Sequence, residues 1–158
     1  SWIVGSRGPS GGVVSQSLIS PVPLKMTLEK LRGFISDHDA EVTRISGERM
    51  RICVKSVLYG KASRKRPIAF NLDIEFEEVC LKANSCGPIV HGAMRTGMQV
   101  TITPVRRRHR KRKDLGNLAS EIIVSLKAYL MAAFEDEELT GLIARKSKVM
   151  LGPIFRKK

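Results

Sequence analysis

Eight consecutive residues, 106–113, carry the strongest chemical signal in the sequence, because seven of them hold a fixed positive charge. The charged members are Arg106, Arg107, Arg108, Arg110, Lys111, Arg112 and Lys113. Such a run produces a local field to which a nucleic-acid backbone, an anionic membrane surface or an acidic protein could bind. On duplex DNA the affinity would fall steeply with salt, because binding releases counterions. On anionic lipid each Lys or Arg would contribute about 1 kcal/mol. In a nuclear protein the run could instead be an import signal.

A second basic segment lies in the turn-rich connection over residues 56–67, and we expect it to support the octet 106–113. Its charged side chains are Lys61, Arg64, Lys65 and Arg66. In the competing interpretation the octet is a solvated loop that offsets acidic residues of the same chain. Those acidic residues are Asp73, Glu75, Glu77 and the cluster 135–138.

Cys80, Cys86 and His91 lie in one predicted loop, but they lack the close ligand pair of most zinc sites and a fourth ligand. The sequence therefore predicts no metal site. With Cys53 the cysteines number three and show no repeated spacing, which indicates reduced thiols rather than a disulfide framework. We expect a reducing compartment, the cytoplasm, with a nuclear or juxtamembrane position as alternatives.

His38 stands between Asp37 and Asp39, a combination that could perform acid and base chemistry, although such residues at a helix end more often serve in capping. The glycine-rich stretch 5–12 lacks the lysine-hydroxyl ending and the preceding strand of a phosphate-binding loop. We therefore predict a protein that is not an enzyme, with no cofactor and no small-molecule substrate.

The composition indicates a single folded domain rather than a disordered chain. A length of 158 residues suits one domain, and a hydrophobic fraction of 42% allows folding without disulfides or a structural metal. Lysine and arginine number 28 against 15 acidic residues, so the net charge of +13 favours polyanionic partners. No segment approaches the roughly 18 consecutive apolar residues of a membrane-spanning helix.

The sequence predicts both helices and strands, and these elements must position the charged residues. Apolar residues at helical spacing predict a helix over 28–37, with Thr27 as its N-cap. Two alternating segments, 41–46 and 49–55, flank a Gly-Glu pair and predict a β-hairpin.

The clearest strand covers residues 68–77, where apolar and polar residues alternate without a break, and a further strand covers 98–103. One face of strand 68–77 is acidic and one face of strand 49–55 is cationic. We therefore expect cross-strand ion pairs, each contributing roughly 0.2–1 kcal/mol. The predicted pairs join Asp73 and Glu75 to Arg49, Arg51 or Lys55.

The remaining segments are a long loop and the C-terminal elements. Residues 80–97 are rich in turn formers and predict a loop, whereas apolar residues at helical spacing predict a helix over 115–133. Residues 134–144 predict a short helix that opens with acidic side chains, and 153–158 predict a basic tail.

Together these elements predict an α+β fold with about four mostly antiparallel strands and two main helices packed on one face. The expected order is helix, hairpin, strand, strand, helix. Residues 1–24 are expected to form a flexible arm or linker rich in Gly, Ser and Pro, residues 25–134 the domain, and residues 135–158 a short acidic helix with a basic tail. Because the sequence begins at Ser1, we expect an upstream segment such as a membrane anchor or another domain.

The element order, the strand at 70–76 and the helical segment at 118–127 resemble the kinase-associated-1 domain. The resemblance covers residues 27–130, and the long 80–97 loop and the acidic C-terminal extension depart from it. It implies an α+β domain whose basic patches bind anionic phospholipids and restrain an attached kinase.

The sequence predicts a non-enzymatic polyanion-binding module, with the phosphate backbone of a nucleic acid as the first partner. Four core-facing aromatic residues leave no platform for stacking bases, so we expect contact with the backbone rather than readout of bases. These residues are Phe34, Phe70, Phe76 and Tyr129. The alternative is a cytosolic regulatory domain of a larger, membrane-anchored protein, in which the same charges contact anionic lipid or an acidic partner. We expect the charges to form a compact, salt-sensitive patch at one edge of the sheet.

Overall fold

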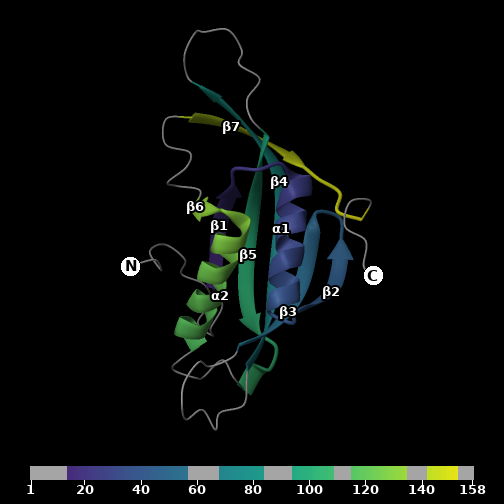
Figure 1. Ribbon diagram of the computed structural model, residues 1–158, viewed down its shortest axis with the longest axis vertical. Coiled ribbons are helices and arrows are strands. Elements are labelled where there is room, and N and C mark those ends of the chain that lie inside the picture. Colours follow the sequence, from purple (N-terminus) through teal and green to yellow (C-terminus); the bar gives the residue numbers. More distant parts are fainter. Residues whose placement is uncertain (1–13, 57–67, 84–93, 109–114, 135–141, 153–158) are drawn as a thin grey trace.

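The computed structural model describes residues 14–56, 68–83, 94–108, 115–134 and 142–152. Within these ranges the chain forms one antiparallel sheet and two helices (Figure 1). In chain order the elements are β1 (Val14–Ser20), α1 (Leu24–Asp37), β2 (Glu41–Ser46), β3 (Arg49–Ser56), β4 (Ile68–Ala83), β5 (Met94–Pro104), α2 (Leu115–Leu130), β6 (Ala133–Phe134) and β7 (Leu142–Lys148). The strand order is β2-β3-β4-β5-β1-β6, and β7 pairs with the second half of β4.

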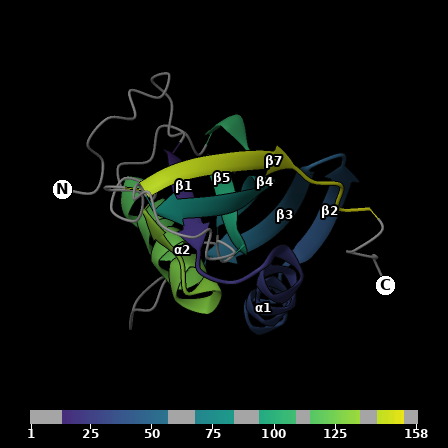
Figure 2. The same ribbon diagram turned by 90° about the horizontal axis from the view of Figure 1, so that it is seen from above.

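Both helices cover the same face of the sheet, as the view from above shows (Figure 2). The α+β class and the antiparallel sheet are therefore confirmed. The sheet is larger than predicted, however, since seven strands take part among the described residues instead of about four. The added strands are β1, β6 and β7.

The expectation of a flexible arm over residues 1–24 is wrong for its second half. Residues 14–20 form β1, which pairs with β5 along its whole length, from Val14 opposite Ile102 to Ser20 opposite Thr96. Serines and a glutamine give this strand a low intrinsic β propensity, and pairing with a neighbouring strand overrides it. Residues 1–13 lie outside the described ranges.

Helix α1 begins at Leu24, earlier than predicted, and Thr27 is not its N-cap. Thr27 is fully buried inside the first turn, where its hydroxyl donates to Thr96 Oγ1 at 3.1 Å. The Thr96 hydroxyl in turn donates to the Val22 carbonyl at 2.9 Å. These buried hydrogen bonds attach the turn between β1 and α1 to β5. They also satisfy both buried hydroxyls, which would destabilise the fold if they were unpaired.

The predicted hairpin is confirmed as β2 and β3, joined at Gly47 and Glu48. Gly47 has a φ of 59°, a left-handed conformation that glycine adopts without strain. The turn also contacts distant parts of the chain. The Phe76 N–H donates to the Glu48 carbonyl at 2.9 Å, and the Leu151 N–H donates to the Gly47 carbonyl at 3.0 Å.

The expectation of a loop over 80–97 is wrong at both ends, because β4 continues to Ala83 and β5 starts at Met94. Turn-forming residues in this region predicted a loop, but the ladder between the two strands continues as far as Cys80 opposite Met94. Residues 84–93 lie outside the described ranges.

The predicted helix 115–133 is confirmed over 115–130 as α2, but it ends three residues earlier than predicted. The predicted helix 134–144 is not formed where the structure describes it. Ala133 and Phe134 form β6, and residues from Leu142 onward form β7. The segment that follows β7 places Val149 and Leu151 in the hydrophobic core. The domain therefore extends beyond the predicted boundary at residue 134. Residues 135–141 and the tail 153–158 lie outside the described ranges.

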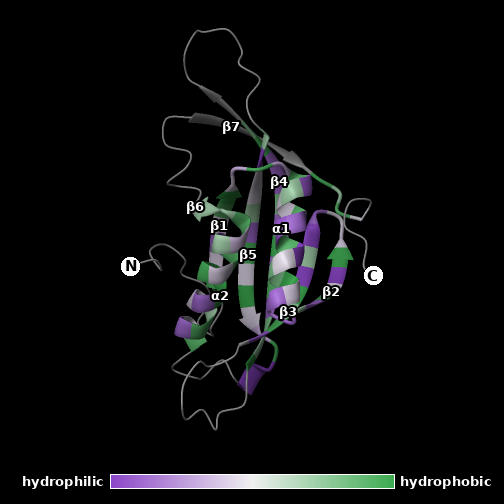
Figure 3. Cartoon of the chain, in the orientation of Figure 1, coloured by the Kyte–Doolittle hydropathy of each residue, from purple (hydrophilic) through white to green (hydrophobic). Residues whose placement is uncertain are grey.

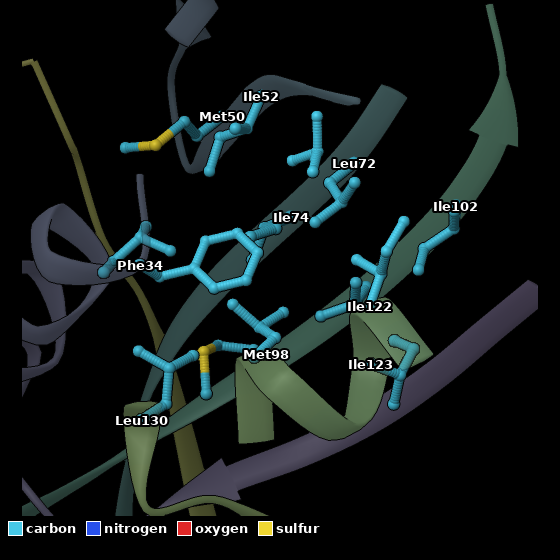
Figure 4. Packing of buried hydrophobic residues seen from close by; sticks show 14 of the residues in the cluster. Phe34, Met50, Ile52, Leu72, Ile74, Met98, Ile102, Ile122, Ile123 and Leu130 are labelled. Carbon is cyan, nitrogen blue, oxygen red and sulfur yellow. The ribbon is translucent and has the colours of Figure 1, made fainter. Parts of the chain in front are cut away.

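The core lies between the sheet and the two helices, and Figure 4 shows part of it. Phe34 of α1 and Leu130 of α2 pack against Ile74 of β4 and Met98 of β5. All the apolar positions of the alternating strand 68–77 are buried, as predicted. Within the described ranges, neither helix combines the length and the apolar character needed to span a membrane.

Candidate functional site

Three strands end together at one end of the sheet, which we call the foot and which is lowest in Figure 1. Ser56, the last residue of β3, is paired with Ile68, the first residue of β4. Pro104 at the end of β5 is paired with Phe70, and the Val105 N–H donates to the Ala69 carbonyl at 2.9 Å. The connection between β3 and β4 therefore leaves and rejoins the sheet at the end where the basic octet begins.

The first part of the octet lies at the foot. Arg106, Arg107 and Arg108 follow β5 after one intervening residue, Val105, and are exposed. The hydrophilic segment after β5 is visible below the sheet in Figure 3. The other predicted site residues lie outside the described ranges. The fold brings to the foot only the described residues next to the two segments that contain them, 57–67 and 109–114. The predicted site residues within these two segments are Lys61, Arg64, Lys65, Arg66, Arg110, Lys111, Arg112 and Lys113.

Cationic side chains also line the outer face of the sheet, the face turned away from the helices. On β3, Met50, Ile52 and Val54 are buried against the helices, so the alternate positions Arg49 and Arg51 belong to the outer face. Lys55 continues this series and is exposed at the foot. Figure 3 shows hydrophilic segments in β2 and β3.

The predicted cross-strand ion pairs are confirmed. Arg51 donates through Nε to Asp73 Oδ1 at 2.7 Å and through Nη2 to Asp73 Oδ2 at 3.1 Å. Arg49 Nε lies 3.3 Å from Glu75 Oε2. The hydrogen bond to Asp73, followed by the attraction of its charge, raises the pKa of Arg51. Both pairs follow directly from the register, which places Arg51 opposite Asp73 and Arg49 opposite Glu75.

These pairs engage two of the acidic residues that the octet was expected to offset, while the acidic cluster 135–138 lies outside the described ranges. Asp73 and Glu75 are already engaged by Arg51 and Arg49. In the part of the chain that the structure describes, no ion pair involves residues 106–108.

A shallow hollow of about 200 Å³ lies on the outer face and extends across the neighbouring strands β2, β3 and β4. It is lined by Arg44, Ser46, Arg49, Met50, Arg51 and Asp73. Sequence reasoning missed Arg44, which lies on β2 directly opposite Arg51. The sequence pattern that could have identified Arg44 is a basic residue in the first strand of a predicted hairpin whose second strand has a cationic face.

His38 connects the two helices. Its Nδ1 lies 3.0 Å from the Phe34 carbonyl oxygen, which can only accept, so Nδ1 carries the proton. In the neutral ring Nε2 then accepts from the Ser125 hydroxyl at 2.9 Å. The ring is also stacked on Phe34, with 4.2 Å between the centroids. His38 therefore links the C-terminal end of α1 to α2. Its position at the helix end agrees with the capping role expected from the sequence.

Metal-ligating side chains do not gather in groups of three or more anywhere in the described ranges. Cys80 lies on β4, and Cys86 and His91 belong to the segment outside those ranges. Cys53 on β3 is a free thiol.

Comparisons with known proteins do not extend this picture. No protein-family model matches the chain, and no curated protein matches it. One similar solved structure is the Zhui aromatase/cyclase from Streptomyces sp. R1128, with 8% sequence identity and a TM-score of 0.34 over 81% of this chain and 94% of that chain. At this level of similarity neither fold nor activity is transferred. The function must be inferred from the chemistry of the chain's own surface.

Proposed function

We propose that this chain is a non-enzymatic polyanion-binding domain whose first partner is the phosphate backbone of a nucleic acid. The binding residues we propose are Arg106, Arg107, Arg108, Arg110, Lys111, Arg112 and Lys113, supported by Lys61, Arg64, Lys65 and Arg66. The observation that carries the proposal is the convergence of β3, β4 and β5 at the foot. Both basic segments start there, and we propose that their charges add to a single field.

A linear polyanion fits the distribution of charge better than a flat surface does. The exposed arginines at 106–108 follow β5 at the foot, and the β3 series runs from Lys55 at the foot to Arg51 and Arg49. A nucleic-acid strand could follow this series. The buried aromatic residues Phe34, Phe70 and Phe76 cannot stack on bases, which favours contact with the backbone and little sequence preference.

The alternative is a regulatory domain that binds anionic lipid, the function that the resemblance to kinase-associated-1 domains implies. One observation favours it, because Val105 is 46% exposed directly beside Arg106. An apolar side chain next to basic ones suits the interface of an anionic bilayer. For either partner we propose a reducing compartment such as the cytoplasm, in keeping with the free thiol of Cys53.

Binding assays with matched probes test the proposal. The chain would be titrated with a 5′-labelled oligonucleotide of about 20 nucleotides, its duplex, a structured RNA, anionic vesicles and neutral vesicles, at about 50 mM and 200 mM salt. An octet variant replaces the seven charged residues of 106–113 by Gln. A control variant removes charges from α1 through Lys25→Gln, Lys30→Gln and Arg32→Gln.

We expect the parent and the α1 control to bind nucleic acid with strong salt dependence, and the octet variant to lose most of this binding. Failure of the parent to bind any nucleic acid at low salt would overturn the first proposal. Binding to anionic vesicles alone would establish the alternative. Equal binding by the parent and the octet variant would show that residues 106–113 are not the site.

A further inference from the structure

The hollow between β2, β3 and β4 concentrates basic side chains that the sequence separates. Arg44 on β2 and Arg51 on β3 are directly opposed in the register. Like charges at directly opposed positions on one face destabilise a sheet unless an anion lies between them. Asp73 pairs with Arg51 from β4, on the side away from Arg44, so it does not lie between the two arginines. For Arg44, the described part of the chain provides no ion pair.

Arg51 is already oriented for recognition. Its two hydrogen bonds to Asp73 use Nε and one hydrogen of Nη2, so three of the five guanidinium N–H donors remain. Asp73 thus fixes the guanidinium plane before any ligand arrives, which lowers the entropy lost on binding. Among the described residues Arg49 forms one ion pair, with Glu75, and its side chain is 70% exposed.

The net charge of the cluster indicates which anion fits. Three guanidinium groups, from Arg44, Arg49 and Arg51, and the Asp73 carboxylate line the hollow. Glu75 lies outside the lining but pairs with Arg49, so the cluster with its ion-pair partners carries one positive charge in excess. A phosphodiester carries a single negative charge and would neutralise that excess. A phosphomonoester, with nearly two charges at neutral pH, would exceed it and be repelled by the nearby carboxylates.

We propose that this hollow binds one phosphodiester group of a nucleic-acid strand whose adjoining part lies against the foot. This inference rests on the proposed function and extends it. It adds a phosphate contact outside the two basic segments, 61–66 and 106–113. Arg51 and Lys55 are four residues apart on β3, about 13 Å in an extended strand. Lys55, exposed at the foot, therefore lies between the hollow and Arg106 on the path that we propose for the nucleic acid.

Arg44→Gln is the test variant, with Arg32→Gln on α1 as the control of equal charge change. The probe is the single-stranded oligonucleotide of about 20 nucleotides, titrated over a range of salt concentrations. Loss of one phosphate contact lowers the slope of log K against log salt by about 0.7 on a single strand. We expect Arg44→Gln to weaken binding several-fold and to reduce the slope by that amount, while Arg32→Gln changes neither.

Stability provides a second readout that separates a binding role from a structural one. Because Arg44 lies opposite Arg51, Arg44→Gln removes a repulsion, and its urea midpoint should equal or exceed that of the parent. A variant that loses affinity while keeping or gaining stability supports the site. A lowered midpoint that accounts for the lost affinity would assign Arg44 to the fold and overturn the inference.

The outcomes for the site and for the proposed function are distinguishable. If the parent binds the oligonucleotide, the octet variant does not, and Arg44→Gln behaves as Arg32→Gln does, then only the inference about the hollow fails. If the parent does not bind at all, both fail. Binding of anionic vesicles that depends on Arg44, without oligonucleotide binding, overturns the nucleic-acid assignment of the site.

Discussion

Tyr129 shows at the scale of one residue how the contact between the helices depends on protonation. Its hydroxyl donates a hydrogen bond to Asp37, and this bond, followed by burial and the charge of Asp37, raises the pKa of Tyr129 above its usual value of about 10. The folded chain therefore holds this proton more tightly than the unfolded chain does. Its contribution to stability is complete below pH of about 10 and declines as the pH rises toward the higher folded pKa.

Tyr129→Phe removes both the hydrogen bond and the titration. We expect the variant to be less stable than the parent at pH of about 8, and the difference between them to shrink as the pH rises above about 10. Urea unfolding of both proteins at several pH values measures it. Lysine titration affects both proteins alike and cancels in the difference, so a difference independent of pH would contradict the assignment.

At the scale of elements, the long pair of strands β4 and β5 depends on the absence of a side chain at Gly97. Gly97 lies opposite Glu77 in the ladder. A Cβ atom there would lie 2.9 Å from Glu77 Cγ and 3.0 Å from Val79 Cγ2. Glu77 has a flexible side chain that can move, but Val79 is fully buried. The close approach of β4 and β5 at this position therefore requires glycine.

Gly97→Ala is predicted to destabilise the domain by about 1–3 kcal/mol, the range typical of overpacking a buried position. Gly116→Ala is the matched control, because nothing lies within 4 Å of a Cβ added at this position in α2. Gly116 lies in the first turn of α2, and alanine has a higher helix propensity than glycine, so this control should be neutral or more stable. Equal unfolding midpoints for Gly97→Ala and the parent would show that the ladder adjusts without strain.

At the scale of the whole molecule, the C-terminal segment belongs to the domain. Leu151 is fully buried in the main core, and its N–H donates to Gly47 in the turn between β2 and β3. Residues 142–148 add β7 to the second half of β4. The first hairpin and the end of the described chain thus stabilise each other over a sequence separation of about one hundred residues, so unfolding of one is expected to disturb the other.

Leu151→Ala should destabilise the domain by about 2–5 kcal/mol, as expected for removing a fully buried leucine. The neighbouring Met150 is 65% exposed, and Met150→Ala should change the unfolding free energy by less than about 0.5 kcal/mol. Thermal or urea unfolding of the two variants compares them directly. Similar losses in both would indicate that the segment is not packed in the core as described.

The sequence alone predicted the elements with strong local periodicity. The strand 68–77 alternates over its whole length, the β2–β3 hairpin surrounds a glycine, and α2 repeats its apolar residues at helical spacing. The ion pairs of Arg51 with Asp73 and Arg49 with Glu75 were also predicted, because they need only two alternating strands side by side. Local periodicity is a property of neighbouring residues, so it can be read without knowing the partners.

Tertiary structure decided the features that depend on partners distant in the sequence. Polar β1 becomes a strand because β5 satisfies its backbone groups, and β7 begins within the segment 134–144, whose local sequence indicated a helix. The opposition of Arg44 and Arg51, and the convergence of β3, β4 and β5 at the foot, likewise come from strand register. Register is set by burial of one face and by turn geometry across the whole sheet, which no local pattern contains.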